Sequence, residues 1–166
     1  VRLAASKPDA AETAARMVQL AGSANDSLKL AALESLATHM KADVAWSPSL
    51  DAAFNKLINS ENLEVAAASL PLLARWKQDG SAAAKPLIAK LIAQVQRADT
   101  SAAQAERIVT SLIRARALDS NILPQTAGLL GSQSPEALQK RLVLTLGETS
   151  DPAVGPILAA ALGKLQ

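Results

Sequence analysis

Two carboxylates and two hydroxyls stand together in GETSDP, residues 147–152 of the chain. Such a set could hold a hard cation or serve acid–base chemistry. Hard-cation loops need several oxygens at fixed spacing around a turn, and this run lacks that spacing. We expect a linker instead, with Gly147 as the left-handed cap of one helix and Asp151 capping another that begins at Pro152.

Other residue types that carry chemistry are scarce in this chain. The single histidine, His39, has no partner of a kind that forms a metal site or a serine–histidine pair, and cysteine is absent. No serine lies in a nucleophile elbow or a phosphate-binding loop. We therefore expect no catalytic, cofactor-binding or metal-ligating residues, and no bound cofactor.

Basic residues are concentrated in the middle of the chain. Residues 75–116 hold eight basic and three acidic residues, a net charge of +5. The preceding residues hold six and eight (−2), and the following residues hold three and four (−1). Either this is a solvated surface, or it is a docking patch for an acidic surface or a phosphate. The candidate partner-binding residues are Arg75, Lys77, Arg107, Arg114 and Arg116.

Composition points to an all-α protein. Hydrophobic residues make up 49% of the chain but aromatic residues only 2%, so the core must be built from aliphatic side chains and alanine. Alanine is the strongest helix former, whereas sheets favour aromatic and β-branched residues. We expect Trp46 and Trp76 to cover the seam between repeated units of the chain rather than to stack on nucleobases. No apolar run approaches the roughly 20 residues that a membrane span needs.

An internal repeat organises the chain. A shift of 37 residues places LAGSANDSLKLAALESLA, from Leu20, on LINSENLEVAAASLPLLA, from Leu57. A further shift of 73 residues reaches LGSQSPEALQKRLVLTLG, from Leu130. Apolar positions coincide in these segments, as where Leu33 falls on Leu70. A period near 37 residues predicts repeated helix–turn–helix units.

Apolar spacing and capping signals set the expected helix bounds. Ser47-Pro48 and Ser134-Pro135 mark helix starts, and Ser101 with Gln104 has the form of a capping box. We expect the first helices of the repeats at residues 9–21, 48–59, 82–97, 120–131 and 152–165, and the second helices at 27–41, 62–77, 101–117 and 135–147.

These units resemble HEAT repeats and the related armadillo-like solenoids. The resemblance covers essentially the whole chain, and Val1-Arg2-Leu3-Ala4 resembles the start of a second helix. The usual turn Asp and the usual Arg early in the second helix are not kept. Prolines in first helices and paired aliphatic residues at their ends carry the resemblance, namely Pro86, Pro124, Pro156, Leu57-Ile58 and Leu129-Leu130.

The resemblance implies one HEAT-like domain over residues 1–166. Its fold would be an α-α superhelix, a right-handed solenoid of about four to five antiparallel helix pairs, with second helices on the concave side. By this reading the chain starts near a second helix and stops after a first helix, whereas a solenoid normally ends in polar capping repeats. We therefore expect a segment of a longer protein. The stretch LVLTLGETSDPAVGPILAAAL also resembles solenoid segments of large exported bacterial proteins, so the compartment is either periplasmic or cytoplasmic.

The function implied is a non-enzymatic interaction or spacer module. Its partner would be another protein or another domain of the same chain. Two alternatives come from the same family: a DNA glycosylase type of enzyme and a tetrapyrrole lyase type of protein. The glycosylase type needs aromatic residues on a basic concave face, and the chain has few aromatic residues and a net charge of only +2. Nucleic acid is therefore the less favoured partner.

Overall fold

The protein is all-α in a computed structural model that describes residues 15–19, 25–40, 44–77, 81–131 and 134–163. No strand occurs among these residues. Residues 15–19 are helical. The remaining helices are α2 (Asp26–His39), α3 (Pro48–Ile58), α4 (Leu63–Trp76), α5 (Ser81–Val95), α6 (Ala102–Arg114), the 3₁₀ helix η2 (Arg116–Leu118), α7 (Ile122–Ala127), α8 (Glu136–Gly147) and α9 (Val154–Leu162).

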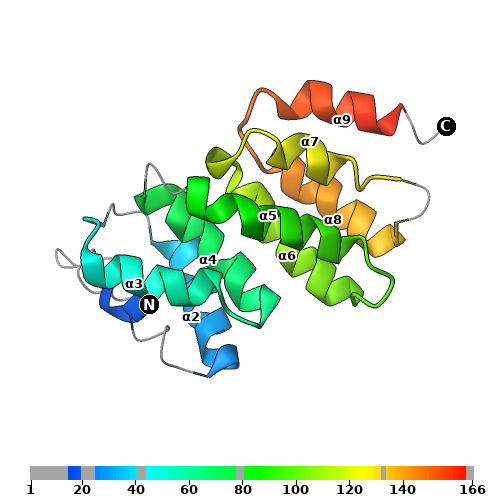
Figure 1. Ribbon diagram of the computed structural model, residues 1–166. Coiled ribbons are helices and arrows are strands. Elements are labelled where there is room, and N and C mark those ends of the chain that lie inside the picture. The colour runs from blue at the N-terminus through cyan, green and yellow to red at the C-terminus, as the bar shows by residue number, and fades with distance from the viewer. Residues whose placement is uncertain (1–14, 20–24, 41–43, 78–80, 132–133, 164–166) are drawn as a thin grey trace.

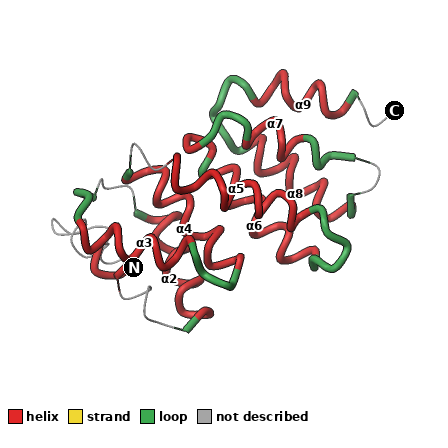
Figure 2. The backbone as a smooth tube through the Cα atoms, viewed as in Figure 1, coloured by secondary structure: helices red, strands yellow, loops and turns green. Residues whose placement is uncertain are grey.

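The helices pack in two rows (Figure 1). Helices α2, α4, α6 and α8 follow one another in one row, each packed on the next. In the other row, α5 packs on α7 and α7 on α9, while α3 packs on α4. The chain therefore progresses from α2 and α3 at one end to α9 at the other, with turns and loops between the helices (Figure 2).

Most expected helices form where the sequence places them, and side-chain caps explain three starts. The Ser47 hydroxyl accepts the Leu50 N–H, with Pro48 as the first helical residue. Ser101 caps α6 by accepting the Gln104 N–H at 3.2 Å. Asn62 caps α4 and accepts two backbone N–H groups. These bonds satisfy donors that have no partner inside the helix.

Three expected helix ends are wrong in detail. Helix α8 begins after Pro135, and the Ser134 hydroxyl donates to the Leu129 carbonyl instead of capping. Helix α9 begins at Val154, two residues after the expected Pro152, because the intervening residues form a turn closed by the Asp151 carbonyl, so Asp151 does not cap the helix. Gly147 is the last residue of α8, and no described glycine has a positive φ, so it is no left-handed cap.

Helix α7 is also much shorter than the expected 120–131. Its last carbonyls accept bonds from residues three positions ahead, so the chain continues beyond Ala127 as a tighter turn. The Thr126 hydroxyl donates to the Ile122 and Leu123 carbonyls, which competes with regular helical bonding. Gly128, a poor helix former, follows directly.

Several expectations fall wholly or partly outside the described residues, which also omit the final residues of the helices expected at 27–41 and 152–165. The resemblance of residues 1–4 to a second helix lies there entirely. Of the helix expected at 9–21, only residues 15–19 are described, and these are helical.

Helix α4 lies at the centre of the core. Every residue from Val65 to Leu73 is buried, including Ser69, whose hydroxyl donates to the Ala66 carbonyl at 2.7 Å. Helices α2, α3, α5 and α6 all pack against it. A helix that is apolar all round needs cover on every side. Its small side chains, Ala66 to Ser69, leave room for the neighbouring helices to approach closely.

The aromatic side chains gather at one place in the fold. The Phe54 ring lies 5.2 Å from the Trp46 ring and 6.2 Å from the Trp76 ring, centroid to centroid. Phe54 and Trp76 are buried and Trp46 is half-buried. The cluster joins α3, the end of α4 and the segment before α3. Both tryptophan rings contact Phe54 of α3, and all three residues lie in or just before the unit expected at 48–77, so these contacts do not test the expected seam between repeats.

Enlarging a small residue of α4 should destabilise the fold. Ala67 is 1% exposed, so Ala67→Leu should lower the free energy of unfolding by about 1–3 kcal/mol through overpacking. Ala52→Leu, on the exposed side of α3, is the matched control and should change it by less than about 0.5 kcal/mol. Urea unfolding followed by circular dichroism measures both. Equal stability of the two variants would contradict a tightly packed α4.

Candidate functional site

A groove lies along the row of even-numbered helices, over the buried helix α4. It has a volume of about 310 Å³, and we call it the α4 groove. Helices α2 and α6, which flank α4, supply most of its walls, and α8 supplies one residue. The α4 groove is lined by Glu34, Thr38, Glu106, Arg107, Thr110, Ser111, Arg114 and Arg141.

Arg107 and Arg114 both line this groove, as their spacing of two helical turns requires. Their states differ. Arg107 is paired with Glu64 of α4 at 2.7 Å, and this contact raises the pKa of Arg107, with a smaller contribution from Glu34. Arg114 makes one weak hydrogen bond, at 3.4 Å, to the Thr38 hydroxyl of α2. Among the described residues, no carboxylate lies within ion-pair distance of Arg114.

Three of the five candidate arginines and lysines meet in a second hollow. Arg75, Arg114 and Arg116 line it together with Ala37, Thr38 and Pro71, and its volume is about 320 Å³. We call it the arginine pocket. It shares Thr38 and Arg114 with the α4 groove, so the two hollows adjoin each other. The structure thus brings Arg75, Arg107, Arg114 and Arg116 onto one face.

Lys77 does not join these arginines. Its ammonium group lies 2.7 Å from the Asp51 carboxylate and 4.9 Å from the centre of the Trp46 ring. It is therefore part of the aromatic cluster at α3, where it closes the end of α4. Sequence spacing alone placed it beside Arg75, but the chain turns away directly after Trp76.

The GETSDP run forms the expected linker between α8 and α9. Asp151 accepts the Ala153 N–H at 3.0 Å and also binds Arg116 at 3.1 Å. The Thr149 hydroxyl donates to the Leu146 carbonyl. A further hollow, of about 370 Å³, is lined by Glu148, Thr149 and Ser150 of this linker. Arg114 and Arg116 line both this hollow and the arginine pocket, so the two are neighbours. The linker therefore forms one edge of the basic face.

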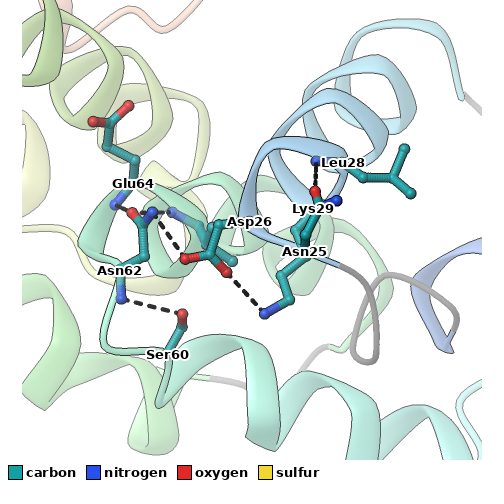
Figure 3. Close-up of polar contacts among 8 residues, drawn as sticks. Asn25, Asp26, Leu28, Lys29, Ser60, Asn62 and Glu64 are labelled. Carbon is teal, nitrogen blue, oxygen red and sulfur yellow. Dashed lines mark hydrogen bonds and ion pairs between the residues drawn. The ribbon is translucent and has the colours of Figure 1, made fainter.

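At the other end of the basic face, polar contacts join the N-terminal ends of α2 and α4 (Figure 3). The Asn62 side chain, which caps α4, also donates to Asp26 of α2 at 3.2 Å. Lys29 donates to the same carboxylate at 2.9 Å. The Glu64 carboxylate points away from this cluster, and Arg107 binds it. These contacts fix α2, α4 and α6 relative to one another below the groove.

Ion pairs lower the pKa of several aspartates. The pKa of Asp51 is lowered mainly by the Lys77 ammonium and then by the Trp46 indole N–H. The Ala153 N–H and then Arg116 lower the pKa of Asp151, while Lys29 and Asn62 do so for Asp26. All three carboxylates are therefore ionised and occupied in structural contacts at neutral pH.

The described residues hold no group of three or more His, Asp or Glu side chains that could bind a metal ion. His39 is half-buried in the last turn of α2, where a basic side chain complements the helix dipole. No helix among the described residues is both long enough and apolar enough to cross a bilayer.

Sequence reasoning missed the groove's other members. Thr38, Thr110 and Arg141 come from three different helices, and none belongs to a recognisable motif. Arg141 donates to Thr110 at 3.4 Å, much as Arg114 does to Thr38. The sequence signal that could have found these residues is the alignment of the repeats, because it predicts that their second helices lie side by side.

Comparisons of the chain with protein-family models, with curated proteins and with solved structures give no match.

Removing the Asp51 carboxylate should change how stability depends on pH. A carboxyl whose pKa is lowered by folding stabilises the fold above its unfolded pKa of about 3.9, and loses this effect as pH falls through the folded value. Asp51→Asn should therefore lower the thermal midpoint at pH 7, and the deficit should shrink towards pH 3. Thermal unfolding by circular dichroism from pH 7 to pH 3 measures this.

The control for Asp51→Asn is Glu61→Gln, which removes an exposed carboxylate. Its midpoint should follow the wild type at every pH. A deficit in Asp51→Asn that stays constant from pH 7 to pH 3 would show that the ionised carboxylate contributes nothing.

Proposed function

We propose that this chain is a HEAT-like, right-handed α-solenoid segment of about four to five antiparallel helix pairs. The two-row packing of helices in chain order and the 37-residue repeat support this architecture. Asn25 and Asn62, one period apart, both cap second helices, so the repeat extends to the capping residues. In such an array each unit packs only on its neighbours and leaves one extended face open.

We infer that the chain is a non-enzymatic binding module and that the α4 groove, with the arginine pocket, is its binding face. The observation that carries this proposal is that the two hollows adjoin each other at Thr38 and Arg114. The partner would be another protein or another domain of the same chain. A partner segment laid along the groove would contact α2, α6 and α8 together.

The position of the aromatic residues weighs against a DNA glycosylase type of function. Trp46, Phe54 and Trp76 pack against one another at α3, and none of them lines the α4 groove or the arginine pocket. Base extrusion requires a pocket that stacks on the flipped base. No observation favours the tetrapyrrole lyase type of function.

The solenoid architecture predicts an elongated particle in solution. A compact globular chain of this length has a radius of gyration of about 15 Å. Small-angle scattering should give a radius of gyration above that value, and a maximum dimension above that of a compact particle. A distance distribution symmetric about its maximum, typical of a globular particle, would contradict the architecture.

Filling the groove should abolish partner binding. Ser111 lies on α6 in the groove wall, so Ser111→Trp should block it, whereas Ala103→Trp adds the same ring at an exposed position of α6 outside it. Affinity purification from the source cells, quantified by mass spectrometry, should recover a partner with wild type and Ala103→Trp but not with Ser111→Trp. Identical recovery by all three proteins would refute the binding face.

A further inference from the structure

Arg114 stands out among the described cations because it lines three hollows and makes only one weak hydrogen bond. A guanidinium carries five N–H donors. Arg114 uses one of them, in a 3.4 Å contact with Thr38. Its side chain is exposed and lines the α4 groove, the arginine pocket and the hollow beside the α8–α9 linker. Its position lets it bind an anion without breaking an existing ion pair.

The other two arginines of the pocket are held in place by the fold. Arg75 donates to the Met40 and Ala37 carbonyls at the end of α2. Arg116 binds Asp151 and also donates to the Ile113 carbonyl at 3.4 Å. The guanidinium groups of Arg75 and Arg116 are therefore held in place by these contacts and add positive charge to the pocket. Most N–H donors of Arg114 make no hydrogen bond to the described residues.

The remaining lining suits a side chain with an apolar stem. Ala37 and Pro71 contribute apolar surface, Thr38 contributes a hydroxyl, and none of the described carboxylates lines this pocket. A glutamate side chain could place its methylenes against the apolar surface and its carboxylate against Arg114. Arginine and carboxylate form two parallel hydrogen bonds, which fix orientation as well as adding affinity.

We propose that the arginine pocket binds the carboxylate side chain of a partner segment, with Arg114 as the anchor. This inference rests on the proposed function and names the chemistry of the partner. A phosphate is the weaker candidate, because the carbonyl end of α2 borders the pocket and a dianion is repelled there more than a monoanion.

The far end of the α4 groove selects against a uniformly acidic partner. Glu34 and Glu106 line it without an ion-pair partner among the described residues, because Arg107 is paired with Glu64 and Arg141 is bonded to Thr110. Glu106 precedes Arg114 by eight residues on α6, which is about 12 Å along the helix. An extended segment covers that span in about four residues. We therefore expect a basic residue about four positions from the acidic one.

Solution NMR of the full chain tests this with a defined probe. The peptide acetyl-GKSGSEG-amide carries the two charges four positions apart, and acetyl-GKSGSQG-amide lacks only the carboxylate. At constant ionic strength, the first peptide should shift the Arg114 Nε–Hε resonance saturably, and the second should not. Inorganic phosphate at equal concentration should shift it less than the first peptide does.

Matched variants separate a specific site from general attraction. Arg114→Gln should weaken binding of the acidic peptide at least tenfold. Arg97→Gln removes an exposed arginine that is paired with Asp99 and lies outside the pocket, and it should leave binding unchanged. Equal losses in the two variants, no Arg114 shift with the acidic peptide, or a larger shift with phosphate would each overturn the proposal.

The partner capture described above distinguishes this inference from the proposed function. If Ser111→Trp loses the partner and Arg114→Gln keeps it, the binding face stands but the carboxylate anchor is wrong. If both variants lose the partner, both proposals are supported. If neither variant loses it, both fail.

Discussion

The burial of the middle of α4 is the constraint on which the rest of the structure depends. Nine consecutive residues, Val65 to Leu73, are buried, and four helices pack against α4. Small side chains make this possible, because alanine and serine keep the distance between packed helices short. Since α2 and α6 flank the same slender helix, Thr38 and Arg114 approach each other across it. The groove is thus a consequence of how α4 is packed.

Polar contacts between neighbouring helices of one row set the positions that packing leaves open. Asn62 of α4 binds Asp26 of α2, Arg107 of α6 binds Glu64 of α4, and Arg75 of α4 binds the carbonyl end of α2. Exposed contacts of this kind contribute little stability each. They do have a second effect, because they occupy charges that would otherwise be open to a partner.

Because contacts within the fold occupy most of these charges, the net charge of the middle of the chain is a poor guide to the binding face. The middle of the chain carries an excess of basic residues, yet most of the candidate cations are bound to carboxylates or carbonyls of the fold. What remains is a local asymmetry: spare donors at Arg114, and carboxylates at Glu34 and Glu106 on the other part of the same groove. A partner would be selected by this pattern rather than by overall attraction.

The sequence by itself determined the helices, because their apolar spacing, proline positions and polar caps are local properties. It placed α3 to within one residue, and it located Arg107 and Arg114 on one face of α6. Exact helix ends such as Val154 depended on bonds to neighbouring residues that compete with a cap. Only the tertiary structure decided which cations are occupied, since Glu64 and Asp151 reach their arginines from 43 and 35 residues away. Periodicity fixes the face of a helix, but an ion pair depends on what the fold brings opposite it.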